Sequence, residues 1–295
     1  MELCAEDIKK TSLSKEGIRE YRLLLLRNFL SHRFAVAGLV IVAVMVVSAV
    51  LAPVIASGGP YVMNVAQRLK PPTPDHIFGT DNFGRDLFSR VVYGLRTSLA
   101  VGFSIAFLSA LFGTIIGLMA AYFPIVDLVV MRVLEGMMAI PSTLMAIAMM
   151  SALGANVVNV IVSLTIVYVP SIAKIARASA LSVKEMTYIE AIRAQGARWN
   201  RIVFVHIAPN IVSPVIVQTT FIFASAILVE SSLSFLGVGI PAPAPSLGNI
   251  LSEAKNVIFN SWWMSICPGT VMLFSVLGIN ILGDGIRDIL DPLSK

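Results

Sequence analysis

Residues 97–122 read TSLAVGFSIAFLSALFGTIIGLMAAY and contain no charged side chain. They lie within a longer uncharged stretch that separates Arg96 from Asp127. A helix needs about 20 mostly apolar residues to cross the hydrocarbon layer of a bilayer. This segment therefore predicts a transmembrane helix, closed by Pro124.

The rest of the chain repeats this pattern. It is 57% hydrophobic and 13% charged, with a mean hydropathy of +0.84, whereas soluble domains carry about 25% charged residues. This composition excludes an ordinary soluble domain and predicts an all-α membrane protein. The other long uncharged stretches lie between Arg33 and Arg68, Glu135 and Lys174, Arg201 and Glu230, and Lys255 and Asp284.

We predict six transmembrane helices. The uncharged stretch after Glu135 is too long for one helix, and we divide it at the turn Gly154-Ala155-Asn156. Pro209, a residue favoured in the first turn of a helix, opens the fifth span. The predicted spans are residues 34–55, 97–122, 128–153, 157–173, 209–236 and 264–287.

Positive charge orients these spans. Cytoplasmic loops are enriched in Lys and Arg, and six spans place both termini and the loop 174–208 in the cytoplasm. The sequence pI of about 9.4 thus follows from topology and requires no nucleic-acid partner. The cations on this side are Lys9, Lys10, Lys15, Arg19, Arg22, Arg27 and Arg33 in the tail, and Lys174, Arg177, Lys184, Arg193, Arg198 and Arg201 in the loop.

The predicted outer loop before the second span fits this rule less well. Three acids, Asp75, Asp81 and Asp86, partly offset its cations, and the spacing of Asp86 and Arg90 predicts a helical ion pair. Loops of this length also obey the rule weakly. The cations of this loop are Arg68, Lys70, Arg85, Arg90 and Arg96.

The chain divides into two parts. Residues 1–96 form a cytoplasmic tail, the first span and an external loop, and residues 97–295 form the core with the loop 174–208. In the tail, the helical spacing of Ile18, Tyr21, Leu25 and Phe29 predicts either a basic helix on the inner membrane surface or an ordinary positive flank. Cys4 and Cys267 imply no disulfide framework.

The loop 174–208 carries the most informative pattern. Thr187 and Glu190 match a capping box, in which both side chains satisfy free amides at a helix start. Gly196 ends this short helix because glycine tolerates positive φ. A second helix over residues 199–207 leads into Pro209, so the loop is predicted to be a rigid helical knob.

Glu190-Ala191, with Gly196 and Pro209 following, resembles the EAA loop of importer-type ABC permeases. Residues 188–197 (YIEAIRAQGA) and 206–210 (HIAPN) are similar to the dipeptide/oligopeptide/nickel branch of that family. Ile192 and Ala208 depart from the commonest pattern, and Ile192 affects packing against an ATPase if it faces one. The resemblance implies that this loop docks on a cytoplasmic ATPase subunit. The implied coupling residues are Thr187, Glu190, Ala191, Arg193, Gly196 and Ala197.

Three more segments support this resemblance, specifically to the C-type subunits of the branch. They are residues 78–99 (FGTDNFGRDLFSRVVYGLRTSL), residues 230–245 (ESSLSFLGVGIPAPAP) and residues 283–292 (GDGIRDILDP). Together with the coupling loop they extend the resemblance over residues 24–292, in the expected order.

Further residues, all charged except Gly84, are candidates for structural or gating roles. Those before the second span are expected to form a folded outer elbow rather than to contact solute. Packing, pairing and gating stay open for Glu135 and Glu230, and a local charge cluster is expected at the end of the sixth span. The set is Asp81, Gly84, Arg85, Asp86, Arg90, Glu135, Glu230, Asp284, Arg287 and Asp288; the solute-binding residues are not identified.

The energy source is expected to be external. Ion-coupled transporters keep ionisable groups near the membrane midplane, where this sequence places none. It also contains no Gly-x-x-x-x-Gly-Lys-Ser/Thr phosphate loop, so the chain is not expected to be an enzyme. We expect it to bind no metal or cofactor, with ATP and magnesium held by partner ATPases.

Two other classes of membrane protein fit poorly. An intramembrane serine protease needs a membrane histidine, whereas His32, His76 and His206 lie at or beyond span ends. An aspartyl protease needs Gly-x-Gly-Asp and a second aspartate, and Gly283-Asp284 gives only half of that motif. An ion channel would need a selectivity filter or a charged voltage sensor, and neither is found in the sequence.

The resemblance implies a prokaryotic cytoplasmic-membrane complex. Its other members are a second homologous permease subunit, two ABC ATPase subunits and an extracytoplasmic solute-binding protein. Solute moves by alternating access, driven by closure of the ATPases. We expect dipeptides or oligopeptides as solutes, with nickel complexes and glutathione as alternatives.

Overall fold

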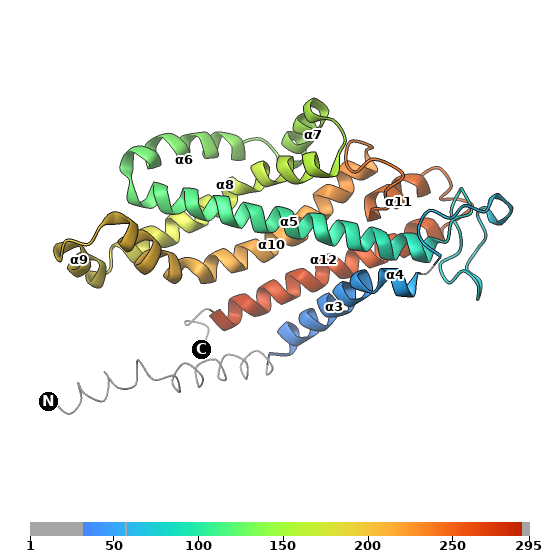
Figure 1. Cartoon of the computed structure of the whole chain (residues 1–295), viewed down its shortest axis with the longest axis horizontal. Coiled ribbons are helices and arrows are strands. Elements are labelled where there is room, and N and C mark those ends of the chain that lie inside the picture. Colours follow the sequence, from blue (N-terminus) through green and yellow to red (C-terminus); the bar gives the residue numbers. More distant parts are fainter. Residues whose placement is uncertain (1–31, 57, 291–295) are drawn as a thin grey trace.

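The computed structural model describes residues 32–56 and 58–290. The predicted tail helix around Ile18–Phe29 and Cys4 lie outside this range. Within it all regular elements are helical, and one isolated bridge joins Thr80 and Asp86. The molecule is elongated, with α9 at one end and α11 and the loop 58–86 at the other (Figure 1).

Ten α-helices follow one another along the described part of the chain. They are α3 (Arg33–Val50), α4 (Ala52–Ile55), α5 (Leu87–Tyr122), α6 (Pro124–Met138), α7 (Ser142–Leu153), α8 (Val157–Lys184), α9 (Thr187–Ala194), α10 (Val212–Phe235), α11 (Leu247–Ala254) and α12 (Trp263–Leu290). A short 3-10 turn covers Val65–Gln67, and a π-helical segment (Arg201–Ile207) and a 3-10 turn (Ala208–Ile211) lead into α10.

Five helical runs are long and apolar enough to cross a membrane. They are α3, α5, α8, the run from Arg201 to Phe235, and α12. A sixth crossing exists only if α6 and α7 together form one span. The chain is therefore a multi-pass helical protein, and the count of six spans stays a prediction.

The third predicted span, residues 128–153, is wrong as a continuous helix. It consists of α6 and α7, whose axes are bent by 94° at the intervening residues. Pro141 lies at this break, immediately before α7. Proline lacks an amide hydrogen and disfavours helical backbone in the residue before it. The bend follows from Pro141, which an uncharged stretch does not reveal.

Two other spans are longer than predicted. α5 begins at Leu87, so the predicted division at residues 96 and 97 falls inside this helix. α8 continues past Ala173 to Lys184. Both predicted ends were set by charged residues, but charge ends only the apolar stretch and not the backbone helix. The fifth helix begins later than predicted, at Val212, because Pro209 lies in the preceding 3-10 turn.

Small residues bring α5 and α8 close together. A Cβ added to Gly113 would lie 2.6 Å from the Ile172 Cβ, and one added to Gly117 would lie 2.5 Å from the Ala173 carbonyl oxygen. Both distances are far shorter than a side-chain contact allows. Membrane helices approach closely where small residues recur every fourth position, and Gly113 and Gly117 have this spacing.

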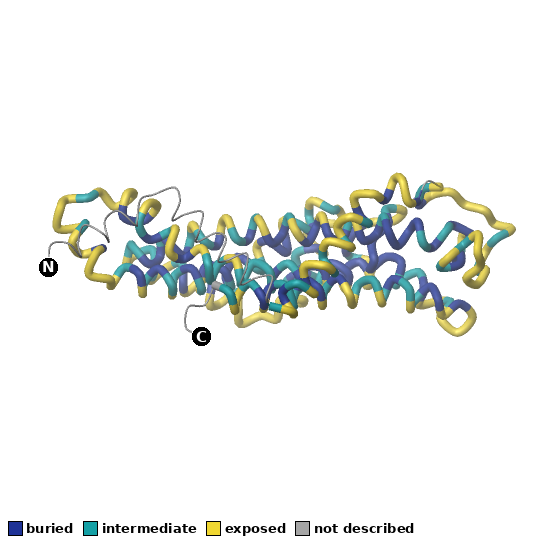
Figure 2. Tube along the Cα trace, turned by 90° about the horizontal axis from the view of Figure 1, so that it is seen from below, coloured by how far each residue is buried: buried dark blue, intermediate teal, exposed yellow. Residues whose placement is uncertain are grey.

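Glycines also allow α3 and α12 to approach closely. A Cβ on Gly38 would lie 2.5 Å from the Leu282 backbone nitrogen, and one on Gly278 would lie 2.5 Å from Ile41. Buried residues follow the contacts between the helices, whereas both ends of the molecule are mainly exposed (Figure 2). The helix contacts therefore hold the middle of the molecule together, between two ends that are mainly exposed.

Candidate functional site

The predicted coupling loop forms one end of the molecule and begins with α9 (Figure 1). Met186 precedes the helix with extended backbone angles, and Thr187 is already its first helical residue. The predicted capping box is therefore wrong, because the Thr187 hydroxyl does not occupy the capping position. No side chain caps this helix start, and Glu190 lies exposed in the first turn.

The end of α9 agrees with prediction. Gly196 has a φ of +80°. Its amide donates to the Arg193 carbonyl at 3.0 Å, and the Ala197 amide donates to the Ile192 carbonyl at 3.3 Å. These two bonds form a Schellman motif, which satisfies helix-end carbonyls and requires a left-handed residue. The predicted role of Gly196 as a helix terminator is confirmed.

α9 has two unlike faces. Ile189 is fully buried and Ile192 half-buried. The predicted coupling residues Thr187, Glu190, Ala191, Arg193 and Gly196 are exposed, and Ala197 is half-buried. The outward face is therefore free to contact another protein. Ile192, one of the residues that depart from the family pattern, is half-buried and packs against the cluster around Ile189.

The inward face is anchored on the transmembrane helices. Ile189 belongs to a buried cluster with Ile202, Val203 and Ile207 of the π-helical segment. The second predicted helix, residues 199–207, is found as this segment. The same cluster includes Leu118 and Ala121 of α5 and Ala176, Ala180 and Val183 of α8. α9 is thus fixed to the ends of two membrane helices.

Further exposed side chains adjoin α9. Trp199, Phe204 and Val205 are exposed apolar residues, and Arg198 and Arg201 are exposed cations. Tyr188 links α9 to the next turn, since Asn210 Nδ2 donates to its hydroxyl at 3.2 Å and to the His206 carbonyl at 2.6 Å. Aromatic and arginine side chains are enriched at protein interfaces. The loop therefore has the chemistry of a protein-docking surface.

A buried ionic cluster occupies the opposite end. Asp81, Arg85 and Arg90 are at most 3% exposed. Arg85 Nε donates to Asp81 Oδ2 at 2.5 Å, and Arg90 Nη1 donates to the same oxygen at 2.8 Å. Both arginines also bind Glu253 of α11, with Arg85 Nη2 at 2.7 Å from Glu253 Oε2. The cluster joins the loop 58–86, α5 and α11.

The predicted ion pair between Asp86 and Arg90 is wrong. Asp86 caps α5 instead, and its Oδ2 accepts a hydrogen bond from the Ser89 amide at 2.8 Å. Its Oδ1 lies 2.9 Å from His76 Nδ1. A capping side chain points along the helix axis toward free amides, so it does not meet a side chain one turn later. Arg90 is instead paired with Asp81 and Glu253.

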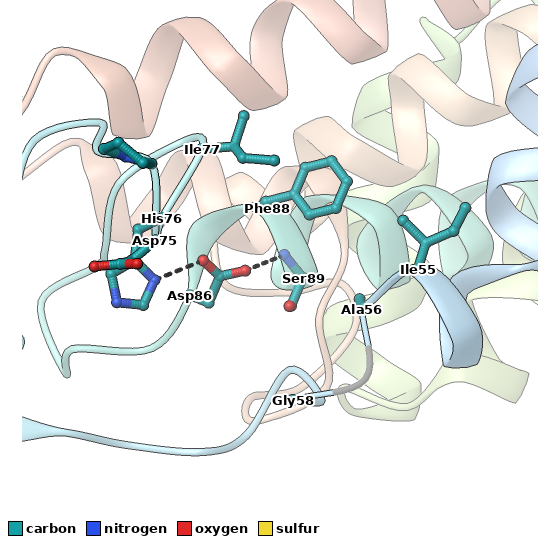
Figure 3. Close-up of a pocket in the computed structure, with 10 residues that line it drawn as sticks. Ile55, Ala56, Gly58, Asp75, His76, Ile77, Asp86, Phe88 and Ser89 are labelled. Carbon is teal, nitrogen blue, oxygen red and sulfur yellow. Dashed lines mark hydrogen bonds and ion pairs between the residues drawn. The ribbon is translucent and has the colours of Figure 1, made fainter.

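Gly84 brings two parts of the loop 58–86 into contact. Gly84 has a φ of +72° and lies directly against the Asn64 backbone. A pocket of about 340 Å³ is lined by Ile55, His76, Asp86 and their neighbours (Figure 3). The dashed contacts in Figure 3 run from His76 to Asp86 and on to Ser89. These polar groups bind one another, which agrees with a folded elbow.

Glu230 lies inside the bundle near the same end. Its side chain is fully buried. Its Oε2 accepts from the Ser98 hydroxyl at 2.8 Å, and its Oε1 accepts from the Ser234 hydroxyl at 2.8 Å. Ser234 in turn accepts from the Ile240 amide at 3.1 Å. Glu230 thus ties α10 to α5 and to the loop that follows α10.

The remaining predicted residues lie apart from these clusters. Glu135 is exposed on α6, 3.5 Å from Arg132. Asp284, Arg287 and Asp288 are exposed at the end of α12, where Asp288 Oδ2 lies 3.3 Å from His32 Nε2. They do not join one site.

Sequence reasoning missed three charged residues with defined partners. Glu253 neutralises Arg85 and Arg90, and the excess of cations over acids in the predicted outer loop was the available signal. Asp127 and Arg177 form a two-bond pair between α6 and α8, with Arg177 Nη2 at 2.7 Å from Asp127 Oδ2. Their position at neighbouring span ends was the only hint. Across the described residues, no group of three or more His, Cys, Asp or Glu side chains is arranged to hold a metal ion.

Comparisons with known proteins agree with this architecture. Residues 113–295 match the family described as binding-protein-dependent transport system inner membrane component. Residues 23–72 match the N-terminal TM domain of oligopeptide transport permease C. The two matches leave residues 73–112 between them, which include most of α5.

Individual relatives extend over nearly the whole chain. A putative peptide transport system permease protein of Brucella abortus is 46% identical over 269 residues, 91% of each chain. The dipeptide transport system permease protein DppC of Alkalihalophilus pseudofirmus is 41% identical over 90% of this chain and 87% of its own. A chain of the MetNI methionine ABC transporter, solved in inward-facing conformations, aligns with a TM-score of 0.56 at 19% identity, over 68% of this chain and 97% of its own. That structural likeness concerns the fold alone.

Proposed function

This chain belongs to the binding-protein-dependent transport system inner membrane components, as a permease subunit of an ABC importer, and we propose that α9 couples it to the ATPase. The observation that carries this proposal is the two-faced geometry of α9. Ile189 is buried among the ends of α5 and α8, while Glu190, Ala191 and Arg193 are exposed. A movement of the ATPase against the exposed face of α9 is transmitted to the membrane helices, because the buried face of α9 packs against them.

The proposed topology places the α9 end in the cytoplasm. It is supported by Arg193, Arg198 and Arg201, which are exposed at this end, and by the enrichment of cations in cytoplasmic loops. At the other end, Glu253 and Asp81 neutralise Arg85 and Arg90, so these cations do not argue for a cytoplasmic position. Both termini are then cytoplasmic, and the membrane is the cytoplasmic membrane of a prokaryote.

The family membership implies ATPase and solute-binding partners. We propose the arrangement of one homologous permease, two ATPase subunits and one extracytoplasmic binding protein. The binding protein would dock at the end that holds α11 and the outer loop. The ATP and magnesium belong to the ATPase subunits, since this sequence contains no phosphate loop, and this chain is proposed to bind no cofactor.

The proposed solute is a dipeptide or a short oligopeptide. The support is that relatives with 37–46% identity are named as peptide or dipeptide transport permeases. Nickel complexes and glutathione are the alternatives. The buried charges Asp81, Arg85 and Arg90 are engaged with one another and with Glu253, which leaves none of them free to hold a charged solute tightly.

In the proposed mechanism, ATP binding closes the two ATPases and draws the coupling loops of the two permeases together. The buried cluster around Ile189 moves with α9 and carries the ends of α5 and α8. The pathway between the permeases then opens outward to the binding protein. Hydrolysis of ATP releases the loops and returns the pathway to face inward.

The test is uptake of a labelled dipeptide into proteoliposomes that hold the whole complex and the binding protein. We expect uptake to require ATP and to fall strongly in Glu190→Ala, while assembly is retained because Glu190 is exposed. Arg132→Gln, an exposed substitution on α6, serves as the control. ATP-independent uptake, or full uptake in Glu190→Ala, would contradict the coupling proposal.

A further inference from the structure

The turn between α5 and α6 receives three contacts from the region that carries the coupling loop. We call residues 121–127 the α5–α6 corner. Phe123 is the single residue between the two helices; its amide bonds to Met119 of α5 at 2.9 Å, and its carbonyl accepts from the Asp127 amide at 3.0 Å. Pro124 then fixes the first turn of α6. The corner is tight, so a movement of one side turns the other.

The first contact comes from Lys184, the last residue of α8. Its Nζ donates to the Ala121 carbonyl oxygen at 2.7 Å and lies 5.6 Å from the centre of the Tyr122 ring. The carbonyl groups of the last turn of a helix have no partner within the helix. Lys184 thus joins the end of α5 to the residue where α8 passes into the coupling loop.

The second contact is the pair of Arg177 and Asp127. Two guanidinium nitrogens meet two carboxylate oxygens, with Arg177 Nη2 at 2.7 Å from Asp127 Oδ2. A two-bond pair fixes direction as well as distance. Both side chains are about two-thirds buried, at 31% and 28% exposure. This pair therefore holds the first turn of α6 in a defined orientation against α8.

The third contact comes directly from the coupling loop. The ring of Trp199 packs edge-on against that of Phe123, with centroids 5.4 Å apart. Trp199 lies between Gly196 and the π-helical segment. The loop therefore contacts the corner itself, in addition to its buried anchor on α5 and α8.

The α5–α6 corner leads directly into α6, and α6 ends at the break before α7. Met131 and Leu134 pack α6 against Ala120 of α5 and Ala173 of α8. Past Met138 the chain bends by 94° into α7. Helices broken within the membrane often line the pathways of transporters. A rotation of α6 at the corner is thus able to displace the bend.

We propose that the α5–α6 corner is the joint through which motion of the coupling loop reaches the bent pair α6–α7. The positioning residues are Arg177, Lys184 and Trp199, which contact the corner and hold it in place. This inference rests on the proposed function of α9 but assigns the transmission to residues outside the coupling motif. Loss of these contacts is expected to lower transport while ATP hydrolysis continues, rather than to stop both.

The first experiment measures peptide uptake and ATP hydrolysis in the same proteoliposomes, with the whole complex and the binding protein. Asp127→Asn keeps the size of the side chain and removes its charge, and Trp199→Leu removes the aromatic contact. We expect hydrolysis to persist and transport per ATP to fall about three- to tenfold, which lies within the range found for residues along a coupling network. Exchange of the charges, Asp127→Arg with Arg177→Asp, is expected to restore part of the loss.

Arg132→Gln is the matched control, because Arg132 forms an ion pair on the same helix but at 79% exposure and with no partner on α8. Its transport per ATP should equal that of the wild type. A fall in the control as large as in Asp127→Asn would overturn the proposal, since general charge loss on α6 would explain both.

The second experiment measures the motion itself. Spin labels are placed at Val133 of α6 and Leu273 of α12, both exposed, in a background with Cys4 and Cys267 replaced by Ser. We expect the distance between them to change on trapping with ATP, and this change to shrink in Asp127→Asn and Trp199→Leu. Equal distance changes and equal transport per ATP in the wild type and both variants would overturn the proposal.

The outcomes separate this proposal from the function on which it rests. Wild-type complex without ATP-dependent uptake would contradict the proposed function, whatever the corner variants do. Normal wild-type uptake with unchanged coupling in the variants would contradict the joint alone. If Asp127→Asn, Trp199→Leu and Lys184→Met all fail to assemble, the contacts serve folding, and the proposal is equally wrong.

Discussion

Gly196 shows how one residue sets the shape of the coupling loop. Its φ of +80° lies in the left-handed region, and a Cβ added there would meet open space. The demand for glycine is therefore conformational and not steric. The Schellman bonds around it turn the chain from α9 toward Trp199, so the angle at Gly196 decides where both arms of the loop point.

We predict that Gly196→Val impairs coupling while Gly196→Asn largely preserves it. A left-handed conformation costs an ordinary residue about 1–2 kcal/mol, and asparagine is among the few that adopt it routinely. ATP-dependent uptake and the ATPase rate of the complex provide the measurement. Equal uptake in the two variants would show that the left-handed turn is dispensable.

Glu230 presents a different residue-scale problem, because a carboxyl group is fully buried inside the bundle. It accepts hydrogen bonds from Ser98 and Ser234, and through Ser234 it is connected to the Ile240 amide. Buried polar groups are tolerated when their hydrogen bonds are made. The contacts assign Glu230 to the joining of α5, α10 and the loop after α10.

We predict that Glu230→Gln leaves the stability of the complex within about 1 kcal/mol of the wild type, because glutamine retains an acceptor and adds a donor that serine can accept. Glu230→Leu is expected to cost about 1–3 kcal/mol, since it strands buried hydroxyls. Thermal unfolding of the detergent-solubilised complex measures both. Equal unfolding temperatures for the two variants would contradict a hydrogen-bonding role.

At the scale of the helices, the contact between α5 and α8 depends on Gly113 and Gly117. Their missing side chains let the two backbones meet, which is how membrane helices gain packing energy without a hydrophobic driving force. The contact also aligns the two helix ends that carry the α9 anchor. Its geometry therefore bears on coupling as well as on folding.

We predict that Gly117→Ala destabilises the complex, whereas Gly136→Ala does not. The new Cβ at residue 117 would lie 2.5 Å from the Ala173 carbonyl oxygen, while that at residue 136 would meet nothing within 4 Å. Alanine otherwise favours a helix over glycine by about 1 kcal/mol, so without a clash both variants would gain. Assembly yield and unfolding temperature are the measurements, and equal behaviour of the variants would refute the close approach.

The helices also show which features of the fold could be predicted from the sequence. Uncharged stretches and the cost of polar groups in lipid located α3, α5, α8, α10 and α12. Their ends were wrong where a helix continues into charged residues, as at Leu87 and Lys184. The break at Pro141 was missed because the spans were placed by uncharged stretches, and one proline does not interrupt such a stretch.

For the candidate site, too, local features were predicted and contacts between distant residues were missed. Gly196 was predicted correctly because a left-handed helix end is a local property of the sequence. The start of α9 was wrong by one residue, because Met186, which has no capping side chain, occupies the position that was assigned to Thr187. Glu253, Asp127 and Arg177 were missed because their partners lie far along the chain, and a single sequence does not show which distant charges meet.

At the scale of the whole molecule, charge is arranged differently at the two ends. Arg85 and Arg90 at the α11 end are neutralised by Asp81 and Glu253. At the α9 end, Arg193, Arg198 and Arg201 are exposed. Arg85 and Arg90, two of the five cations that conflicted with the predicted topology, are thus internal to the fold, whereas Arg68, Lys70 and Arg96 are exposed. The α9 end keeps the positive surface expected of a cytoplasmic face.

The proposed function depends above all on one contact, between the exposed face of α9 and the ATPase subunit. Ala191 lies on that face, and Phe259, an exposed residue between α11 and α12, lies at the opposite end. A photo-reactive amino acid at each position, in the assembled complex in its native membrane, tests this contact most directly. We predict that residue 191 cross-links to the ATPase subunit and residue 259 does not. Capture of the ATPase from residue 259, or none from residue 191, would contradict both the coupling role and the orientation.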